Sequence, residues 1–339
     1  MLHRRGLLAT PLAFPAIRHA MAQAPHTQAP QAQASWSPTR PVTLLVGFAP
    51  GGGTDIIARL LAPAMGQALG QPIAVENRPG ASGTIAALAG TRAPPDGHTL
   101  YMSTVSASAV VPPQMHPPPF DIHRDQTAIC LAATVPLVAV VPLASPARDL
   151  AGLIALARAN PGGLNYSSSG VATQQHLAAE LLCLAAGVQM THVPFRGTGQ
   201  AVNEILAGRI DLAIDTFPTY LPQIRGERVR ALATTMPERI EWLPDLPTVA
   251  ETRFPGFDAA DFDANVWYML MGPPGLPAPI RDRWAAVMGQ ALADPTLRPR
   301  IRDAGFIPGG GDSAAATALL EKDAARYAAL IARANIRIE

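Results

Sequence analysis

Hydrophobic and polar positions form a strand, a turn and a helix near residue 50. Residues 42–46 (VTLLV) are a short apolar run rich in β-branched side chains, which predicts a buried strand. Residues 50–53 (PGGG) break the run, and Thr54 or Asp55 can cap a following helix. That helix is predicted by apolar side chains on one face: Ile56, Ile57, Leu60 and Leu61. Free backbone N–H groups at a helix N-terminus favour an anion site. A glycine-rich turn without a ligand is an equally supported interpretation.

Two nucleotide-binding motifs are excluded at this turn. A Walker loop ends in Gly-Lys-Ser or Gly-Lys-Thr, whereas Gly53-Thr54-Asp55 supplies no lysine. The dinucleotide fingerprint requires a third glycine where Ile56 stands. Asp55 would also repel a phosphate. A carboxylate-bearing ligand fits better, because it could meet Asp55 through its own protonated groups or through water.

Strands and helices alternate along most of the remaining chain. The predicted strands are residues 73–76, 99–104, 164–166, 189–193, 212–214 and 229–234. The predicted helices are residues 83–92, 150–159, 173–186, 200–207 and 220–225, followed by a mostly helical tail over 280–335. This alternation indicates an α/β fold with a parallel sheet. The long apolar run 129–141 is a candidate to cross from one lobe to another.

The first residues are typical of an export signal. Residues 3–5 (HRR) form a basic segment, residues 7–14 are a short apolar run, and small-x-small cleavage sites follow at 20–24. The run is too short to span a bilayer, and the paired arginines are compatible with twin-arginine export. We therefore expect a signal peptide over 1–24 and a disordered leader over 25–40, rich in Ala, Gln and Pro.

Composition narrows the classes of function. The chain has 339 residues, of which 48% are hydrophobic and 15% charged, and its formal net charge is +1. The near-neutral charge and the lack of a basic stripe argue against a nucleic-acid partner. Cys130 and Cys183 are expected to be buried free thiols, although they could pair in an oxidising compartment. Neither cysteine has metal-ligand spacing to a histidine, so we expect no metal and no cofactor.

Polar turns follow several predicted strands. The predicted strand 99–104 ends in the hydroxyl residues Ser103, Thr104 and Ser106, which would emerge at the carboxyl edge, where open α/β sheets bind ligands. Ser168, Ser169 and Gly170 open a helix and form a second polar turn like the first. If the two turns face one another across a cleft, their hydroxyl and N–H groups could hold both ends of a small acid. An ordinary serine-rich helix cap is the simpler interpretation.

Four residues at three places allow alternative interpretations. Ser169 and His176 could be a nucleophile and its base, but no Gly-x-Ser-x-Gly elbow frames the serine, so hydrolase chemistry is the second choice. Asp215 ends a strand and could contact a ligand amine or water, or it could cap the following helix. Arg196 could pair with a ligand carboxylate, although a solvated loop arginine is the simpler assignment.

Several short motifs together resemble one family. They are residues 48–55 (FAPGGGTD), 75–80 (VENRPG), 95–97 (PDG), 176–180 (HLAAE), 192–197 (HVPFRG), 243–251 (LPDLPTVAE) and Trp267. In number and order these motifs resemble the Bug family, the TctC-like substrate-binding proteins of tripartite tricarboxylate transporters. The similarity extends from about residue 38 to the C-terminus.

The resemblance implies a type II periplasmic binding protein fold and no enzymatic activity. Lobe 1 would comprise residues 41–138 and 256–339, and lobe 2 residues 139–255, with a hinge and a ligand cleft between them. The expected partners are a small carboxylate and the subunits of a membrane transporter, with a two-component sensor as the alternative. The protein would be a periplasmic monomer.

The resemblance also assigns the ligand site. The first loop would bind a ligand carboxylate, partly through water, and the second lobe's turn would bind another group. The ligand-binding residues that the resemblance implies are Phe48, Ala49, Gly52, Gly53, Thr54, Asp55, Ser168, Ser169, Gly170 and Thr173. We add Ser103, for its place at a strand end, and Asp215, which matches a common family aspartate to which the resemblance gives no fixed role.

Three features depart from the family pattern. Phe48 and Phe195 stand near positions where the family usually has tyrosine, so hydroxyl contacts from those places are lost. Residues 256–267 form a longer segment with added aspartates at 258, 261 and 263. Neither turn contains a lysine, which favours a mono- or dicarboxylate over a tricarboxylate.

Overall fold

The computed structural model describes residues 36–252 and 264–334. The predicted signal peptide (1–24), most of the predicted leader (25–40) and the aspartates at 258, 261 and 263 lie outside these residues. Trp36, inside the predicted leader, packs against the rings of His98 and Trp284 at centroid distances of 5.8 and 6.2 Å. The Thr39 N–H donates to His98 Nε2. The leader thus includes residues that contact the folded chain.

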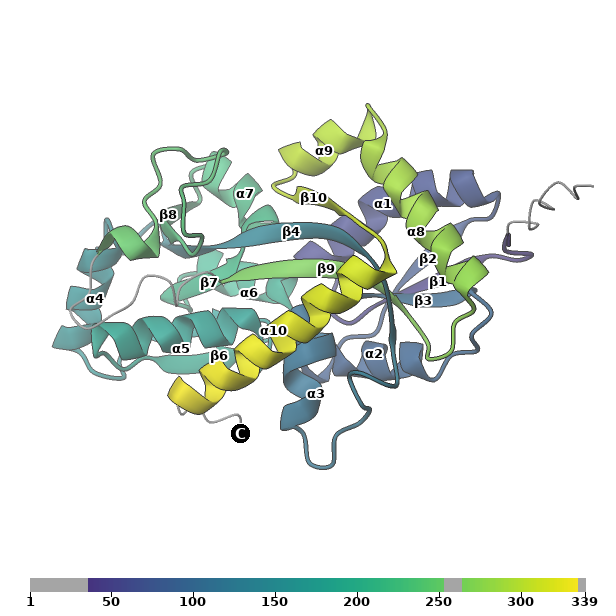
Figure 1. Ribbon diagram of the computed structural model, residues 1–339. Helices are drawn as coiled ribbons and strands as arrows, with labels where there is room; N and C mark the ends of the chain where they lie inside the picture. The colour runs from purple at the N-terminus through teal and green to yellow at the C-terminus, as the bar shows by residue number, and fades with distance from the viewer. Residues whose placement is uncertain (1–35, 253–263, 335–339) are drawn as a thin grey trace, which may run out of the picture. The chain divides into compact units, whose positions relative to one another are not determined.

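The α/β alternation predicted from the sequence is present (Figure 1). The strands are β1 Val42–Val46, β2 Ile73–Asn77, β3 Thr99–Thr104, β4 Thr127–Pro142, β5 Asn165–Ser168, β6 Thr191–Pro194, β7 Leu212–Thr216, β8 Val229–Thr234, β9 Asn265–Gly272 and β10 Ile307–Gly310. The helices are α1 Gly53–Leu69, α2 Thr84–Thr91, α3 Val111–Gln114, α4 Leu150–Ala159, α5 Gln174–Ala186, α6 Thr198–Leu206, α7 Phe217–Arg225, α8 Ala278–Ala293, α9 Leu297–Asp303 and α10 Ser313–Ala334. Short π or 3₁₀ turns occupy Ser106–Val110, Ala81–Gly83 and Val249–Thr252.

The strands hydrogen-bond in the order β2-β1-β3-β9-β4-β7-β5-β6, with β8 and β10 also paired to β4. β1 pairs with β2 and β3 in parallel, and β5 pairs in parallel with β6 and β7. β9 is antiparallel to both β3 and β4. Because carboxyl ends of parallel strands share one edge, the loops after β1 and β3 meet, as do those after β5 and β7.

The parallel strands form two groups, β1 with β2 and β3, and β5 with β6 and β7. β4 connects these two groups, because it pairs with β9, the neighbour of β3, and with β7. Its first ten residues pair with β9, and residues from Leu137 onward pair with β7 and β8. The apolar run predicted over 129–141 forms this strand, and its buried side chains explain its near-continuous hydrophobicity. Helix α10 contacts β4 and crosses in front of it in Figure 1.

One large apolar core underlies most of the sheet, with a smaller one beneath β7, α6 and α7. Trp267 is 1% exposed, and its indole Nε1–H donates to Asp323 Oδ2 (2.8 Å), so β9 is anchored to α10. Cys130 and Cys183 are both buried and free, as expected. Burial raises the pKa of each thiol to about 12, which keeps both protonated and unreactive at neutral pH.

Candidate ligand site

A small cavity lies where loops from the two groups of strands meet. Its first side is lined by Phe48, Gly52, Gly53, Thr54, Thr104 and Ser106. Val266 and Tyr268 on β9 also line this first side, and the second side is lined by Ser169, Gln175, Thr198 and Thr216. The free space for a water-sized sphere is about 20 Å³, roughly what one water needs. A dicarboxylate therefore requires the two sides to move apart.

The cavity combines helix N-termini with neutral polar groups. Gly53 begins α1, Thr198 begins α6, Gln175 lies in the first turn of α5 and Thr216 precedes α7. Each helix N-terminus carries about half a positive charge and exposes N–H donors. None of the described residues that line the cavity is Lys, Arg or His. The geometry therefore suits an anion held by dipoles, hydroxyls and amides.

The loop after β1 is held in place by contacts on both sides. The Ala49 N–H donates to the Arg196 carbonyl (3.2 Å), joining this loop to the loop after β6. Gly51 has φ +82°, in the left-handed region that favours glycine. Gly53 lies beneath Tyr268, and a Cβ at Gly53 would come within 2.1 Å of the Tyr268 hydroxyl oxygen. Close approach at this point requires a glycine.

Asp55 shapes this loop from behind. Its Oδ2 accepts from the Gly51 N–H (3.0 Å), and its Oδ1 accepts from Arg59 Nε and Asn77 Nδ2 (both 2.9 Å). Asn77 also donates to the Phe48 carbonyl (3.0 Å). These donors offset the burial of the carboxylate and hold the pKa of Asp55 below its usual value. Asp55 does not line the cavity, and its oxygens are already occupied by protein donors.

Replacing Asp55 by alanine is expected to lower the free energy of unfolding by about 2–3 kcal/mol, because charge-assisted bonds from three donors are lost. Urea unfolding at pH 7 measures this, with Glu76→Ala as a control. Glu76 forms a half-exposed ion pair with Arg78, which should contribute under about 1 kcal/mol.

Since the pKa of Asp55 in the folded state is lowered, its contribution to stability is present above pH 3.8 and is lost as the pH falls below that value. Equal losses in the two variants would contradict this role.

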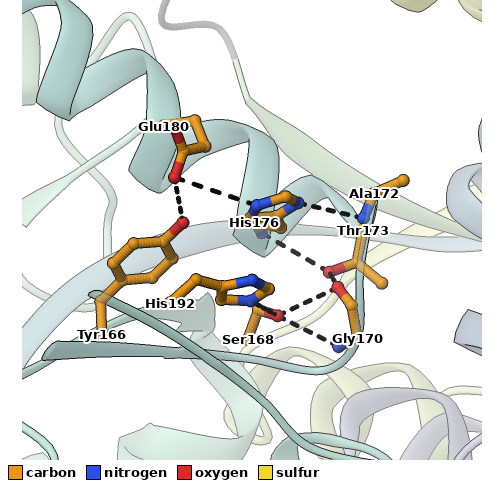
Figure 2. Close-up of polar contacts among 8 residues, drawn as sticks. All are labelled: Tyr166, Ser168, Gly170, Ala172, Thr173, His176, Glu180 and His192. Carbon is orange, nitrogen blue, oxygen red and sulfur yellow. Dashed lines mark hydrogen bonds and ion pairs between the residues drawn. The ribbon is translucent and has the colours of Figure 1, made fainter. Parts of the chain in front are cut away.

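The second polar turn is the segment 168–173, between β5 and α5 (Figure 2). Ser168 is buried, and its Oγ lies 2.7 Å from His192 Nε2. The Thr173 hydroxyl donates to the Gly170 carbonyl (2.7 Å), and Thr173 caps α5 by accepting from the His176 N–H. Of these turn residues, Ser169 alone lines the small cavity. Ser168 and Thr173 therefore build the turn, and Ser169 is its group directed at the cavity.

A second hollow of about 290 Å³ adjoins the small cavity and shares Phe48 and Ser169 with it. Gly170 and the exposed Arg196 line this second hollow. The Ser82 hydroxyl donates to the Val171 carbonyl (2.6 Å) and closes one side of it. Phe48 and Ser169 are thus shared by a neutral inner cavity and an outer hollow that has a cationic side chain.

Ser103 and Asp215 lie behind the cavity wall. Ser103 Oγ is 2.6 Å from Ser108 Oγ, while its neighbours Thr104 and Ser106 reach the cavity. Asp215 Oδ1 accepts from Gln175 Nε2 (3.0 Å), Thr198 Oγ1 (2.8 Å) and Thr216 N (2.6 Å). These three partners all line the cavity. Asp215 therefore orients three cavity groups from beneath.

Several cavity residues were not identified from the sequence. Thr198 begins α6, Gln175 is the second residue of α5 and Thr216 directly precedes α7, and a helix start is a signal that the sequence does carry. Tyr268 lies inside an apolar strand and gives no such signal. Among the described residues, no group of three His, Cys, Asp or Glu side chains could hold a metal ion.

The serine and histidine of the hydrolase alternative serve other contacts. The histidine that contacts a serine is His192, whose Nε2 lies 2.7 Å from Ser168 Oγ. His176 Nδ1 accepts from the Ala172 N–H (3.1 Å) instead. Within the part of the chain that the structure describes, Ser169 and His176 form no hydrogen bond that could activate a nucleophile.

Comparison with known proteins identifies the family. A family profile described as the tripartite tricarboxylate transporter family receptor matches residues 57–336. The chain belongs to this receptor family. Family members are transport receptors and not enzymes, which removes the hydrolase alternative. The UPF0065 protein in the tcbD-tcbE intergenic region of Pseudomonas sp. (strain P51) is 37% identical over 296 residues, which cover 87% of this chain and 86% of the relative.

Solved structures of the family have the same fold. R. palustris Rpa4515 with adipate is 32% identical with a TM-score of 0.83, covering 88% of this chain and 98% of that one. The periplasmic binding protein BugD is 30% identical with a TM-score of 0.82, covering 88% and 99%. The Bug resemblance and the α/β periplasmic binding protein fold are thereby confirmed. No helix in the described ranges combines the length and apolar character needed to cross a bilayer.

Proposed function

We propose that this receptor binds a small mono- or dicarboxylate, an acidic amino acid or an aromatic acid in the periplasm and delivers it to a tripartite tricarboxylate-type transporter. The observation that carries the proposal is the cavity of neutral donors at four helix N-termini. Rpa4515, a related protein solved with adipate, supports the choice of ligand class.

The ligand would bind between two lobes, residues 41–138 with 256–339 and residues 139–255, which separate to admit it. Opening would break the Ala49–Arg196 and Ser82–Val171 hydrogen bonds, each of which joins one proposed lobe to the other. A bound acid would offset their loss by contacting both lobes, so it stabilises the closed form by its differential contacts. We propose that the receptor acts as a monomer.

The inner wall favours one carboxylate group over three. Gly53, Thr54, Ser169 and Thr198 supply neutral donors, whereas the buried Asp215 disfavours a second negative charge close by. A second carboxylate would lie toward the outer hollow, where Arg196 is exposed. This arrangement supports a mono- or dicarboxylate.

A thermal-shift screen tests the ligand class. Purified protein is heated with adipate, malate, citrate, glutamate, aspartate, benzoate and nicotinate, each beside its neutral amide where one exists. A ligand at a hundredfold excess over its dissociation constant should stabilise the protein by about 2.7 kcal/mol and raise the melting midpoint. One class of acid should give the shift and its amide should not. If no acid shifts the midpoint, the carboxylate assignment is wrong.

A further inference from the structure

Three aromatic rings stack beside the turn at 168–173 (Figure 2). They are Tyr166 on β5, His192 on β6 and His176 on α5. The centroid distances are 5.0 Å between Tyr166 and His192 and 4.0 Å between the two histidines, with planes within 18° of parallel. The Tyr166 hydroxyl donates to Glu180, so the stack is fixed at that end.

Each histidine contacts one part of the turn. His192 Nε2 lies 2.7 Å from Ser168 Oγ, and the Gly170 N–H donates to the same oxygen (3.2 Å). His176 Nδ1 accepts from the Ala172 N–H (3.1 Å). The two rings therefore hold the turn on both sides of Ser169, the residue that reaches the cavity.

The backbone of this turn needs such support. Ala172 has φ +61°, a left-handed conformation that costs a non-glycine residue about 1 kcal/mol or more. Gly170 has φ +140°, and a side chain there would meet Ser82 at 2.5 Å. A contact that fixes the Ala172 N–H therefore opposes the relaxation of a strained segment.

The His176–Ala172 contact exists only while His176 is neutral. An N–H donor requires an unprotonated Nδ1, and a proton there would set two donors against each other. Burial lowers the pKa of His176 and of His192 to about 4, and at 4.0 Å each ring also opposes a charge on the other.

The surroundings provide little to stabilise a charged pair. Glu180 on α5 lies 3.9 Å from His176 Nε2 and is partly exposed. Tyr166 on β5 and Cys183 on α5 have pKa values raised by burial, so both stay neutral. Asp215 on β7 meets α5 through Gln175. Among the residues that the structure describes, Glu180 is the acidic group that contacts the stack.

We propose that His176 and His192 are positioning residues for the turn at 168–173, and that protonation of this pair loosens the turn and weakens ligand binding in acid. The proposal rests on the proposed function, because it takes Ser169 as a ligand contact. Hydrogen exchange of the turn tests it without any ligand, and affinity for a probe tests its link to binding.

The matched variants are His176→Phe and His176→Asn. Phenylalanine keeps a stacked ring but removes the acceptor, whereas the asparagine Oδ1 can occupy the place of Nδ1 and cannot be protonated. The double variant His176→Asn with His192→Gln removes both titrating rings. Exchange of peptides spanning 168–173 is measured by mass spectrometry at pH 7 and pH 5 and corrected for the intrinsic rate at each pH.

In the wild type, protection of the turn should fall more than tenfold from pH 7 to pH 5. A histidine with a pKa of about 4 in the closed turn and 6.5 in the open one favours opening as it gains a proton. His176→Phe should be weakly protected at both pH values, and the double variant should stay protected at both. The positioning role is overturned if wild-type protection is independent of pH, or if His176→Phe is protected as well as wild type.

Adipate is the probe for the binding arm, measured by calorimetry at pH 7. His176→Phe should weaken its affinity at least tenfold, and His176→Asn less than threefold. Equal affinities in wild type and His176→Phe would overturn the link between the turn and binding. If the exchange results are as expected but wild type binds neither adipate nor any acid in the screen, the proposed function fails while the role of the histidines in the turn stands.

Discussion

Gly53→Ala is expected to abolish measurable ligand binding and to destabilise the fold by about 1–3 kcal/mol. The new Cβ would lie 2.1 Å from the Tyr268 hydroxyl oxygen and 3.0 Å from its Cζ. Tyr268 is 1% exposed on the central strand β9 and cannot easily move away. Displacing either residue distorts the α1 N-terminus, which supplies cavity N–H groups. Thermal unfolding and the acid screen measure both effects.

Gly52→Ala is the matched control for this substitution. Gly52 has φ −82° and ψ 166°, which any residue adopts, and a Cβ there meets nothing closer than 3.7 Å. It should change stability by less than about 0.5 kcal/mol. Adding Tyr268→Phe to Gly53→Ala should recover part of the lost stability, because the hydroxyl makes the shortest clash. If the two alanine variants have the same free energy of unfolding, the close approach of Gly53 to Tyr268 has no role in stability.

Asp215→Asn is expected to stabilise the protein near pH 8 by roughly 2–3 kcal/mol. Asp215 is fully buried, and its Oδ2 has no partner among the described residues. Burial raises its pKa to about 6, and each unit above 3.8 corresponds to about 1.4 kcal/mol. The asparagine Oδ1 can still accept the bonds from Gln175, Thr198 and Thr216.

The sign of the pH dependence follows from the raised pKa of Asp215. Between pH 3.8 and 6 the folded state binds more protons than the unfolded state, so this group lowers stability as the pH rises through that range. The loss persists above pH 6. The difference in unfolding free energy between Asp215→Asn and wild type should therefore be small at pH 4 and large at pH 8. Urea unfolding at both pH values measures it, and a difference independent of pH would contradict the assignment.

Local sequence patterns predicted the βα units well, because their signals lie within short segments. The strand over 42–46, the strand over 99–104 and the helix over 150–159 have the observed bounds. The first loop was also placed at the cavity through Gly52, Gly53 and Thr54. A strand, a glycine turn and a helix cap act within about twenty residues, where periodicity is informative.

Long-range contacts determine the rest of the site. Tyr268 meets Gly53 across more than two hundred residues, and nothing in its apolar strand predicts a cavity group. Ser169 was considered as the partner of a histidine, but Ser168 is the serine that contacts one, His192. Successive residues at a strand end point to opposite sides, so Ser168 and Ser169 have different neighbours. Asp55 was predicted to contact the ligand, but in the fold its carboxylate accepts hydrogen bonds from Arg59 and Asn77.

Isothermal titration of the protein with the acid that gives the largest thermal shift tests the central claim most directly. Ser169→Ala removes a hydroxyl that lines the cavity, whereas Ser167→Ala removes a fully buried neighbour that does not. We predict that Ser169→Ala weakens affinity about tenfold, the loss of one hydrogen bond to a charged group, and that Ser167→Ala changes it less than threefold. Unchanged affinity in Ser169→Ala, or no binding of any acid by wild type, would contradict a carboxylate site in this cavity.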